Sequence, residues 1–283
     1  MLVFSNKKEI QEFLGEKKAE QNTIGFVPTM GALHKGHVSL LKAAQKDCSI
    51  SVVSIFVNPT QFNNQDDLIK YPRTLENDLE ILKKNGCDVV FTPPVDEIYP
   101  KTYQKLKIDL SPIDEVMEGE FRPGHFHGVA SVVHRFFELL NPDKAYFGKK
   151  DFQQVAVIER MVKTFNLSVK VVAVETLREK NGLAMSSRNL RLTEAEKESA
   201  ATIYETLSLG KKLASSKSPK ETRLEMLKNF NSEDLELEYL EIVDPVSLLS
   251  LDKEWVAGAT ACIAAFCSGV RLIDNVQLIP FSN

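Results

Sequence analysis

The segment TIGFVPTMGALHKGH, residues 23–37, indicates the fold class, because a buried strand here leads through a polar turn into a helix. Its first six residues are mainly apolar and end at a proline, which is typical of a buried strand. Apolar residues then recur at helical spacing over residues 38–45. Ligands of open α/β sheets bind at the carboxyl ends of strands, so the intervening turn is the first candidate site.

The same alternation of strand and helix continues to about residue 175. Apolar runs indicate further strands at 50–57, 87–93, 145–147 and 169–174. The first of these runs is rich in β-branched residues, as expected of a parallel strand covered on both faces. Helices are predicted over 74–84, where Thr74 is a candidate N-cap, over 129–140, and after Asp151. The alternation predicts an α/β fold, with a Rossmann-like, doubly wound parallel sheet over residues 1–178.

The pattern changes after Asn189. Thr193 and Glu196 have the spacing of a capping box, which predicts the start of a helix. A second helix is predicted near residues 220–230. Strand-like runs follow at 235–243, 259–266 and 270–279. Helices followed by strands predict a smaller α+β domain over residues 179–283, which we expect to act as a lid.

Composition narrows the class of protein. Among 283 residues, 35 Lys+Arg against 39 Asp+Glu give a net charge of −4, which is no electrostatic footprint for nucleic acid or an anionic membrane. No apolar run approaches the roughly 18–20 residues of a membrane span, and the N-terminus does not resemble a signal peptide. The four cysteines form no CxxC pair, so we expect reduced core residues in a cytoplasmic protein and no structural zinc.

His34 and His37 stand three residues apart at a predicted helix start, which places both rings on one side of the first turn. A helix N-terminus supplies free N–H groups and partial positive charge, so two imidazoles there suit an anionic group such as a triphosphate. Gly31 and Gly36 would let the backbone approach such a ligand closely. The segment is neither GxGxxG nor GxxxxGK[ST], which argues against a dinucleotide oxidoreductase and a P-loop kinase. The alternative is two surface histidines and glycines that serve the turn alone.

Other polar residues follow predicted strands. Gln61 offers a donor and acceptors for hydroxyl and carboxylate groups, or caps a loop. Arg122 suits planar carboxylate or phosphate recognition. His125 and His127 have a strand-like i, i+2 spacing that could chelate zinc, but only His134 lies near as a third ligand, so no zinc site is expected.

Two further segments are candidate ligand-binding loops, because they carry charged residues and connect predicted elements or domains. FGKKDFQQ, residues 147–154, turns from a short strand into a helix, where Asp151 is a ribose contact, an N-cap, or both. MSSRN, residues 185–189, supplies hydroxyl donors and a forked cation for phosphates, or is a polar hinge between domains.

Together these motifs resemble one family. PTMGALHKGH, SIFVNPTQF, YPRTLENDL, EGEFRPGHFHGV, YFGKKDFQQ, NGLAMSSRN and RLIDN occur, between residues 28 and 275, in the order of the pantoate–β-alanine ligase family. That family belongs to the nucleotidyltransferase superfamily with the HxGH (HIGH-type) motif. The resemblance implies ATP-dependent condensation of pantoate with β-alanine through a pantoyl adenylate, giving pantothenate, AMP and pyrophosphate. It further implies Mg²⁺ held mainly by the ATP phosphates, and a homodimer.

The resemblance also implies roles for individual residues. The catalytic residues are expected to be His37, His34 and Lys150, with His37 as a proton donor and Lys150 on the phosphates. Expected ATP-binding residues are Met30, Gly31, Ala32, Leu33, His34, Lys35, Gly36, His37, Gly148, Lys149, Lys150, Asp151, Leu177, Met185, Ser186, Ser187 and Arg188. Those expected to bind pantoate and β-alanine are Gln61, Gln154, Arg122 and His125. Asp78 is either a candidate metal-side carboxylate or an ordinary aspartate on a helix surface.

Two positions depart from the family pattern. Asn63 replaces a usual glycine after Gln61-Phe62, and we expect a similar turn because asparagine tolerates left-handed geometry. Lys149 stands at a commonly acidic position, so its charge is expected to alter the rim of the site. Another adenylyl or cytidylyl transferase, a tRNA synthetase and a non-catalytic ATP-binding module remain as alternatives. The RPGHF and GLAMSSRN motifs argue against the first, and the net charge argues against the second.

Overall fold

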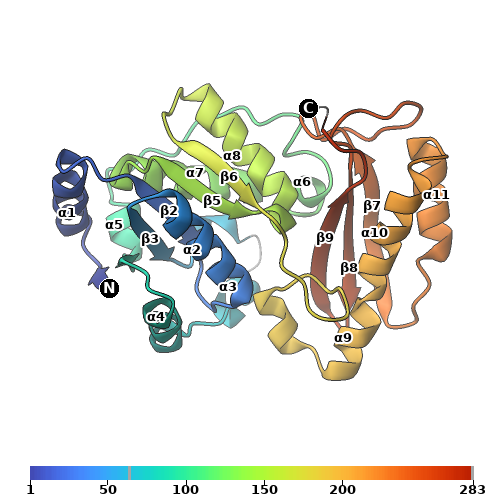
Figure 1. The fold of residues 1–283 in the computed structure, drawn as a ribbon, viewed down its shortest axis with the longest axis horizontal. Coiled ribbons are helices and arrows are strands. Elements are labelled where there is room, and N and C mark those ends of the chain that lie inside the picture. Colours follow the sequence, from blue (N-terminus) through green and yellow to red (C-terminus); the bar gives the residue numbers. More distant parts are fainter. Residues whose placement is uncertain (63–64, 282–283) are drawn as a thin grey trace.

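The computed structural model describes residues 1–62 and 65–281 of the chain, so the departure at Asn63 lies outside the described residues. Two sheets lie side by side (Figure 1). The larger sheet has the order β1-β4-β3-β2-β5-β6, and all its strand pairs are parallel. Its strands are β1 (Leu2–Phe4), β2 (Ile24–Thr29), β3 (Ile50–Ile55), β4 (Val89–Phe91), β5 (Lys144–Gly148) and β6 (Lys170–Val174).

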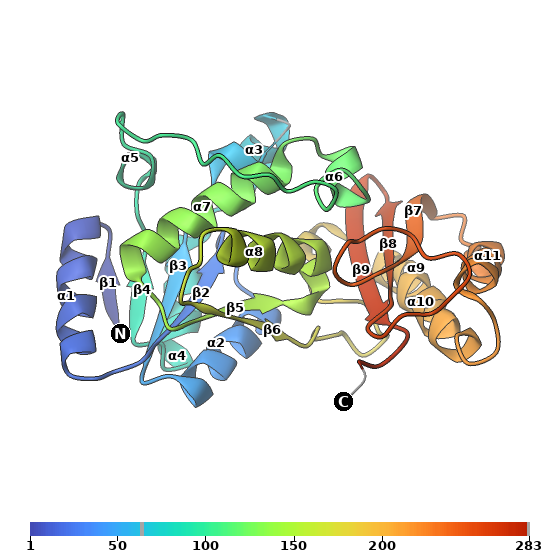
Figure 2. The same ribbon diagram turned by 90° about the horizontal axis from the view of Figure 1, so that it is seen from above.

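Helices cover both faces of this sheet (Figure 2). One face carries α1 (Lys7–Ala19), α7 (His125–Leu140) and α8 (Phe152–Thr164), and the other carries α2 (Lys35–Asp47) and α4 (Leu75–Lys84). Shorter elements connect the strands: η1 (Pro59–Gln61), α3 (Gln65–Lys70), α5 (Val95–Ile98), α6 (Glu118–Phe121) and η2 (Lys149–Asp151). The two-sided cover explains why the strands are continuous apolar runs rather than alternating ones.

Side chains of each strand alternate between two buried cores. Phe26 packs with the α1, α7 and α8 side, and its neighbour Val27 packs with the α2 and α4 side. Val52 and Val53 divide in the same way. A strand directs successive side chains to opposite faces, so both must be apolar when both faces are covered.

The strand order reverses around β2. From β2 the chain adds β3 and β4 on one side, then crosses to add β5 and β6 on the other. Such a reversal leaves a crevice beyond the carboxyl ends of the strands. The segments after β2, β3 and β5 meet there, and these segments hold the histidine pair, Gln61 and Lys150.

The C-terminal part forms a smaller α+β unit. Its elements are η3 (Ser187–Arg191), α9 (Glu194–Ala200), α10 (Thr202–Leu213), α11 (Pro219–Asn229), β7 (Leu235–Val243), β8 (Thr260–Cys267) and β9 (Val270–Gln277). The strands form an antiparallel sheet with α10 and α11 on its outer face (Figure 1). The capping box of Thr193 and Glu196 is confirmed. The predicted fold class is therefore confirmed, and the boundary at residues 178 and 179 stays a prediction.

Some elements and caps differ from the expectation. β1 and α1 were not predicted from the sequence: β1 has only three residues, and α1 is mostly polar and buries only Ile10 and Leu14. Thr74 precedes α4 as expected, but within the described residues its side chain makes no cap hydrogen bond and donates to Asp78 instead. The four cysteines are free. Over the described residues, every helix is too short or too polar to cross a membrane.

Candidate active site

A cavity of about 230 Å³ opens at the carboxyl edge of the parallel sheet and extends to the C-terminal part. The predicted site residues that line it are Met30, His34, Gly36, His37, Gln61, Arg122, His125, Gly148, Lys150, Asp151, Gln154, Leu177, Met185, Ser186, Ser187 and Arg188. Among the described residues, the lining does not include the predicted Gly31, Ala32, Leu33, Lys35 and Lys149. It does include residues that the sequence did not single out, among them Thr29, Asn58, Tyr71, Tyr146 and Thr176.

Asp78 shapes the turn between β2 and α2. Its carboxylate is fully buried and accepts hydrogen bonds from the backbone N–H groups of Ala32 (2.9 Å) and Leu33 (2.8 Å). Both oxygens are thus engaged, so the interpretation as a surface aspartate is wrong, and the geometry does not support a metal-side role. A buried charge that accepts several N–H groups fixes the loop that carries them. Gly31 has a φ of +83°, and a Cβ there would lie 3.0 Å from Asp78 Oδ2, so the turn itself requires glycine.

His34 and His37 form the start of α2. His34 is the N-cap residue, and its Nδ1 accepts from the Gly36 N–H (3.1 Å). The Nδ1 of His37 accepts from the His34 N–H (3.2 Å), which completes a reciprocal capping box. The ring centroids lie 4.1 Å apart, as the i, i+3 spacing predicted. A Cβ on residue 36 would lie 2.7 Å from the His34 ring, so glycine is required there by the protein's own histidine.

These contacts define the protonation of the pair. Burial, together with the charge of Lys150, lowers the pKa of His34 to about 4. Burial, the neighbouring His34 and Lys150 lower the pKa of His37 to about 3. Both rings are therefore neutral near pH 7, and because each Nδ1 accepts a backbone N–H, each proton sits on Nε2. The site presents two neutral N–H donors rather than two imidazolium charges.

A pH prediction follows from these pKa values. A histidine with a lowered pKa binds its proton more readily in the unfolded chain, so its stabilising contribution is complete above about pH 6.5 and is lost as the pH falls toward 4. We expect chemical denaturation to show a falling free energy of unfolding between about pH 6.5 and 4. Turnover at saturating substrate should show no histidine inflection between about pH 6 and 8. A turnover inflection near pH 6.5 that replacement of His34 abolishes would contradict the assignment.

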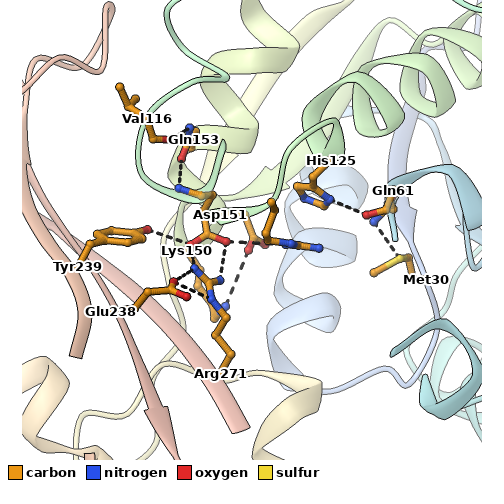
Figure 3. A network of polar contacts seen from close by, with 12 residues as sticks. Met30, Gln61, Val116, His125, Lys150, Asp151, Gln153, Glu238, Tyr239 and Arg271 are labelled. Carbon is orange, nitrogen blue, oxygen red and sulfur yellow. Dashed lines mark hydrogen bonds and ion pairs between the residues drawn. The ribbon is translucent and has the colours of Figure 1, made fainter. Parts of the chain in front are cut away.

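Gln61 lies in η1, beyond the carboxyl end of β3, and is held from two sides. Its Oε1 accepts from Asn58 Nδ2 (3.1 Å), and its Nε2 lies 3.1 Å from Met30 Sδ (Figure 3). Asn58 is itself buried, and its Nδ2 also reaches the carbonyl of Gly128 in α7 (3.2 Å). Asn58 therefore orients Gln61, a role that its place in NPTQF could have suggested.

His125 sits beside Gln61 at the first turn of α7. Its Nδ1 donates to the Gln61 carbonyl (2.8 Å), which leaves Nε2 as an acceptor on the neutral ring (Figure 3). Burial and the Arg122 charge lower the pKa of His125 to about 4. The strand-like interpretation of His125 and His127 is wrong, because both lie in a helix, and His127 pairs with Asp114 (3.3 Å). An i, i+2 pair on a helix points in different directions.

The side chains of the two lysines of η2, Lys149 and Lys150, point in different directions. Lys150 lines the cavity with a side chain only 15% exposed, and its nearest carboxylate oxygen, on Asp151, is 3.8 Å away. Lys149 is not among the described residues that line the cavity, but its side chain pairs with Glu175, which does line it. The contact of Lys149 with ATP stays a prediction. Asp151 occupies the N-cap position of α8 without a side-chain cap hydrogen bond in the described structure, so its carboxylate is left toward the cavity.

The side chains of the adjacent glutamines of α8, Gln153 and Gln154, also point in different directions. Gln153 is buried and holds the loop before α6, donating to the carbonyls of Ile113 (2.8 Å) and Val116 (2.7 Å). Gln154, which was predicted to bind pantoate, lines the cavity. Successive helical residues point about 100° apart, so one amide can serve the protein and the other a ligand.

Hydrogen bonds within residues 177–188 stabilise the segment before η3. The Met185 N–H donates to the Leu177 carbonyl (2.9 Å), and the Ser186 hydroxyl accepts from the Arg188 N–H (3.2 Å). Leu177 and residues 185–188 line the same cavity as the histidine pair, and a Cβ on Gly36 would lie 4.0 Å from Met185 Cβ. The segment provides hydroxyls, backbone groups and a guanidinium on the side of the C-terminal part.

A charged network joins α6 to the C-terminal sheet (Figure 3). Arg271 of β9 donates to both oxygens of Glu118 (2.7 and 2.6 Å) and also pairs with Glu238. Tyr239 donates to Glu118 as well (3.0 Å). Burial raises the pKa of Glu118, but Arg271 and Arg122 outweigh burial and hold it below its usual range. RLIDN, which carried no derivable chemistry in the sequence, thus joins the two parts of the chain.

The described residues contain no cluster of three or more His, Cys, Asp or Glu side chains that could hold a metal ion. The acidic group nearest to the histidine turn, Asp78, is buried and engaged by backbone N–H groups. A resident metal does not fit these residues.

The fold and the cavity define an α/β protein whose ligand-binding edge suits an anionic group. The family model described as Pantoate-beta-alanine ligase matches residues 2–277. Pantothenate synthetase of Porphyromonas gingivalis is 46% identical over 280 residues, which cover 98% of this chain and 99% of that protein. Pantothenate synthetase of Flavobacterium psychrophilum is 46% identical over 281 residues, which cover 98% of this chain and 100% of that protein.

Solved structures agree with these relatives. Pantoate-β-alanine ligase (pantothenate synthetase) of Thermus thermophilus superposes with a TM-score of 0.93 at 40% identity, covering 99% of this chain and 100% of that one. The Francisella tularensis pantoate-β-alanine ligase, complexed with β-γ ATP and β-alanine, gives a TM-score of 0.79 at 35% identity and 98% coverage of both chains. The chain belongs to the pantoate–β-alanine ligase family, whose enzymes form pantothenate. Membership argues against the tRNA synthetase and other nucleotidyltransferase alternatives.

Proposed function

We propose that the protein condenses pantoate with β-alanine in two steps at this cavity, using ATP. In the first step a pantoate carboxylate oxygen attacks the α-phosphorus of ATP, and pyrophosphate leaves, giving pantoyl adenylate. In the second step the β-alanine amine attacks the activated carbonyl carbon, loses a proton, and expels AMP to give pantothenate. The protein supplies no nucleophile in either step, so its contribution is positioning and stabilisation of developing charge.

The phosphate-binding roles fall to the groups that converge on the cavity. Lys150 supplies the cation, and residues 186–188 supply hydroxyls and a guanidinium. His34 and His37 each supply an Nε2–H, so we assign them hydrogen-bond donation to phosphate oxygens. Proton donation by His37 does not suit a ring whose pKa is about 3, because that ring is neutral at working pH.

We assign substrate binding to Gln61, Gln154, Arg122 and His125, all of which line the cavity. Amides can donate to a carboxylate and accept from hydroxyls, which suits the hydroxy acid pantoate. Arg122, beside Glu118 (3.7 Å), supplies a guanidinium for a substrate carboxylate. We propose that Mg²⁺ enters bound to the ATP phosphates as part of the substrate, since the described residues offer it no cluster of ligands.

The observation that supports this function most is the convergence of Lys150 on the histidine pair, close enough for its charge to lower both pKa values. The test is pyrophosphate release from purified protein with Mg-ATP, pantoate and β-alanine, omitting each in turn. We expect release to require pantoate, and AMP and pantothenate to form when β-alanine is added. ATP binding without release under any combination would favour the non-catalytic alternative.

Replacing Gln61 with alanine is expected to weaken pantoate binding about 10-fold or more, because it removes a positioned amide from a charged ligand. ATP affinity should change less than about threefold, since the role assigned to Gln61 is binding pantoate and not ATP. Calorimetry with each ligand separately measures both constants. Gln45→Ala is the matched control, because within the described residues that amide hydrogen-bonds with the Asn85 and Gly86 carbonyls and with Lys42. An equal loss of both affinities would contradict the assignment.

A further inference from the structure

Asn275 of β9 reaches across from the C-terminal sheet to the segment that carries Lys150. Its Nδ2 donates to the carbonyl of Lys149 (2.9 Å) and to the carbonyl of Lys150 (2.8 Å). One amide group thus uses both of its hydrogens on two successive carbonyls. The contact joins residues separated by about 125 positions in sequence, so no local motif reveals it.

The segment that Asn275 contacts, residues 149–151, has few stabilising hydrogen bonds of its own. Lys149–Asp151 is a single 3₁₀ turn, and within the described residues neither Gly148 nor Asp151 provides a side-chain cap. A 3₁₀ turn has poorer hydrogen-bond geometry than an α-helix, and its terminal carbonyls need outside partners. Asn275 provides those partners from a rigid strand.

Asn275 is itself fixed by its neighbour. Asp274 is 4% exposed, and its Oδ1 accepts from the Asn275 N–H (2.8 Å). Arg178 binds both Asp274 oxygens (2.5 and 3.0 Å) and stacks on the Tyr204 ring at 4.0 Å. Arg178 also donates to the Gly182 carbonyl (3.1 Å), just before the segment 185–188. The same end of β9 therefore holds both cation-bearing segments of the cavity.

We propose that Asn275 is a positioning residue for Lys150, setting where the lysine ammonium lies relative to the histidine pair. The proposal rests on the function proposed above. Asn275 contacts the carbonyls of both Lys149 and Lys150, so its proposed effect on the reaction passes through the position of that lysine. Without the two hydrogen bonds from Asn275, the turn relaxes. The Lys150 ammonium then shifts away from the phosphate oxygens on which negative charge develops.

The test uses Asn275→Ala and, to keep the volume filled, Asn275→Leu, both of which remove the two donors. We expect either variant to lower kcat for pantoate-dependent pyrophosphate release by roughly 10- to 100-fold, the cost of an ångström-scale misplacement. The KM for pantoate should stay within about twofold, because Gln61 is held separately by Asn58. Gln277→Ala is the matched control: it removes an amide of the same strand that donates to the Ile279 carbonyl.

A double-mutant cycle separates positioning from general destabilisation. In a Lys150→Ala background, single-turnover measurements should show less than about a twofold further effect of Asn275→Ala, because the group it positions is gone. Effects that multiply independently, or an Asn275→Ala variant indistinguishable from Gln277→Ala, would overturn the proposal.

A second measurement does not depend on the reaction. Hydrogen exchange of peptides covering residues 148–154 should accelerate in Asn275→Ala and Asn275→Leu but not in Gln277→Ala. Absence of pyrophosphate release from the unaltered protein would refute the proposed function alone. Unchanged hydrogen exchange in both Asn275 variants would refute the proposal that Asn275 positions the Lys150 segment.

Discussion

Lys150→Ala is expected to slow pantoate-dependent pyrophosphate release by about 100- to 1000-fold, the usual cost of removing a positioned charge stabiliser from an active site. The lysine lines the cavity, and its charge is felt by both His34 and His37. Its closest carboxylate partner lies 3.8 Å away, so its loss should leave the fold intact. Single-turnover release, with circular dichroism as a check on folding, measures the effect.

Lys149→Ala provides the control. It removes the same charge from the adjacent position, but Lys149 is not among the described lining residues, and its side chain pairs with Glu175 of the lining. Its turnover should stay within about threefold of the unaltered protein, because exposed ion pairs contribute little. Near-normal turnover of Lys150→Ala, or equal losses from both lysines, would contradict the assignment.

His34→Asn should retain the stability of the protein and lose about 100-fold in pyrophosphate release. Asparagine is a preferred N-cap residue, so it can accept from the Gly36 N–H as the histidine does. It cannot place an N–H where the Nε2–H of His34 lies. His34→Ala should show the same loss of rate and also lose about 1 kcal/mol of stability, because the cap is gone.

Thermal unfolding and single-turnover assays on the two His34 variants separate the cap from the chemistry. His134→Ala is the control, since that ring packs on Phe165 and pairs with Glu138 on α7. If His34→Asn turned over at the normal rate, the ring would be a helix cap only, and the anion-binding role of the pair would be wrong.

Local patterns predicted most of the fold. The run 235–243 is the full extent of β7, and the run 50–57 contains β3. The spacing of His34 and His37 correctly placed both rings together, because three residues span about one helical turn. Interactions between near neighbours in sequence depend on little else, so the sequence is sufficient to predict them.

Local patterns failed where a residue's partner is distant in sequence. Asp78 looked like a helix-surface aspartate, but a turn 45 residues earlier buries it. Lys149 and Lys150 look alike in sequence, and only the packing shows which one faces the cavity. The i, i+2 spacing of His125 and His127 could chelate zinc only on a strand, and both residues lie on a helix.

The order of residues along the chain was enough to predict the alternation of strands and helices, the order of the motifs and the family. The state of the site depends on the folded molecule: the pKa values of His34 and His37 follow from burial, which the fold creates. Packing also selects the residues that hold the site together, because Asn275 reaches the Lys150 segment only after the two sheets pack. Electrostatics and long-range hydrogen bonds depend on three-dimensional neighbours, whereas secondary structure and motifs depend mainly on neighbours along the chain.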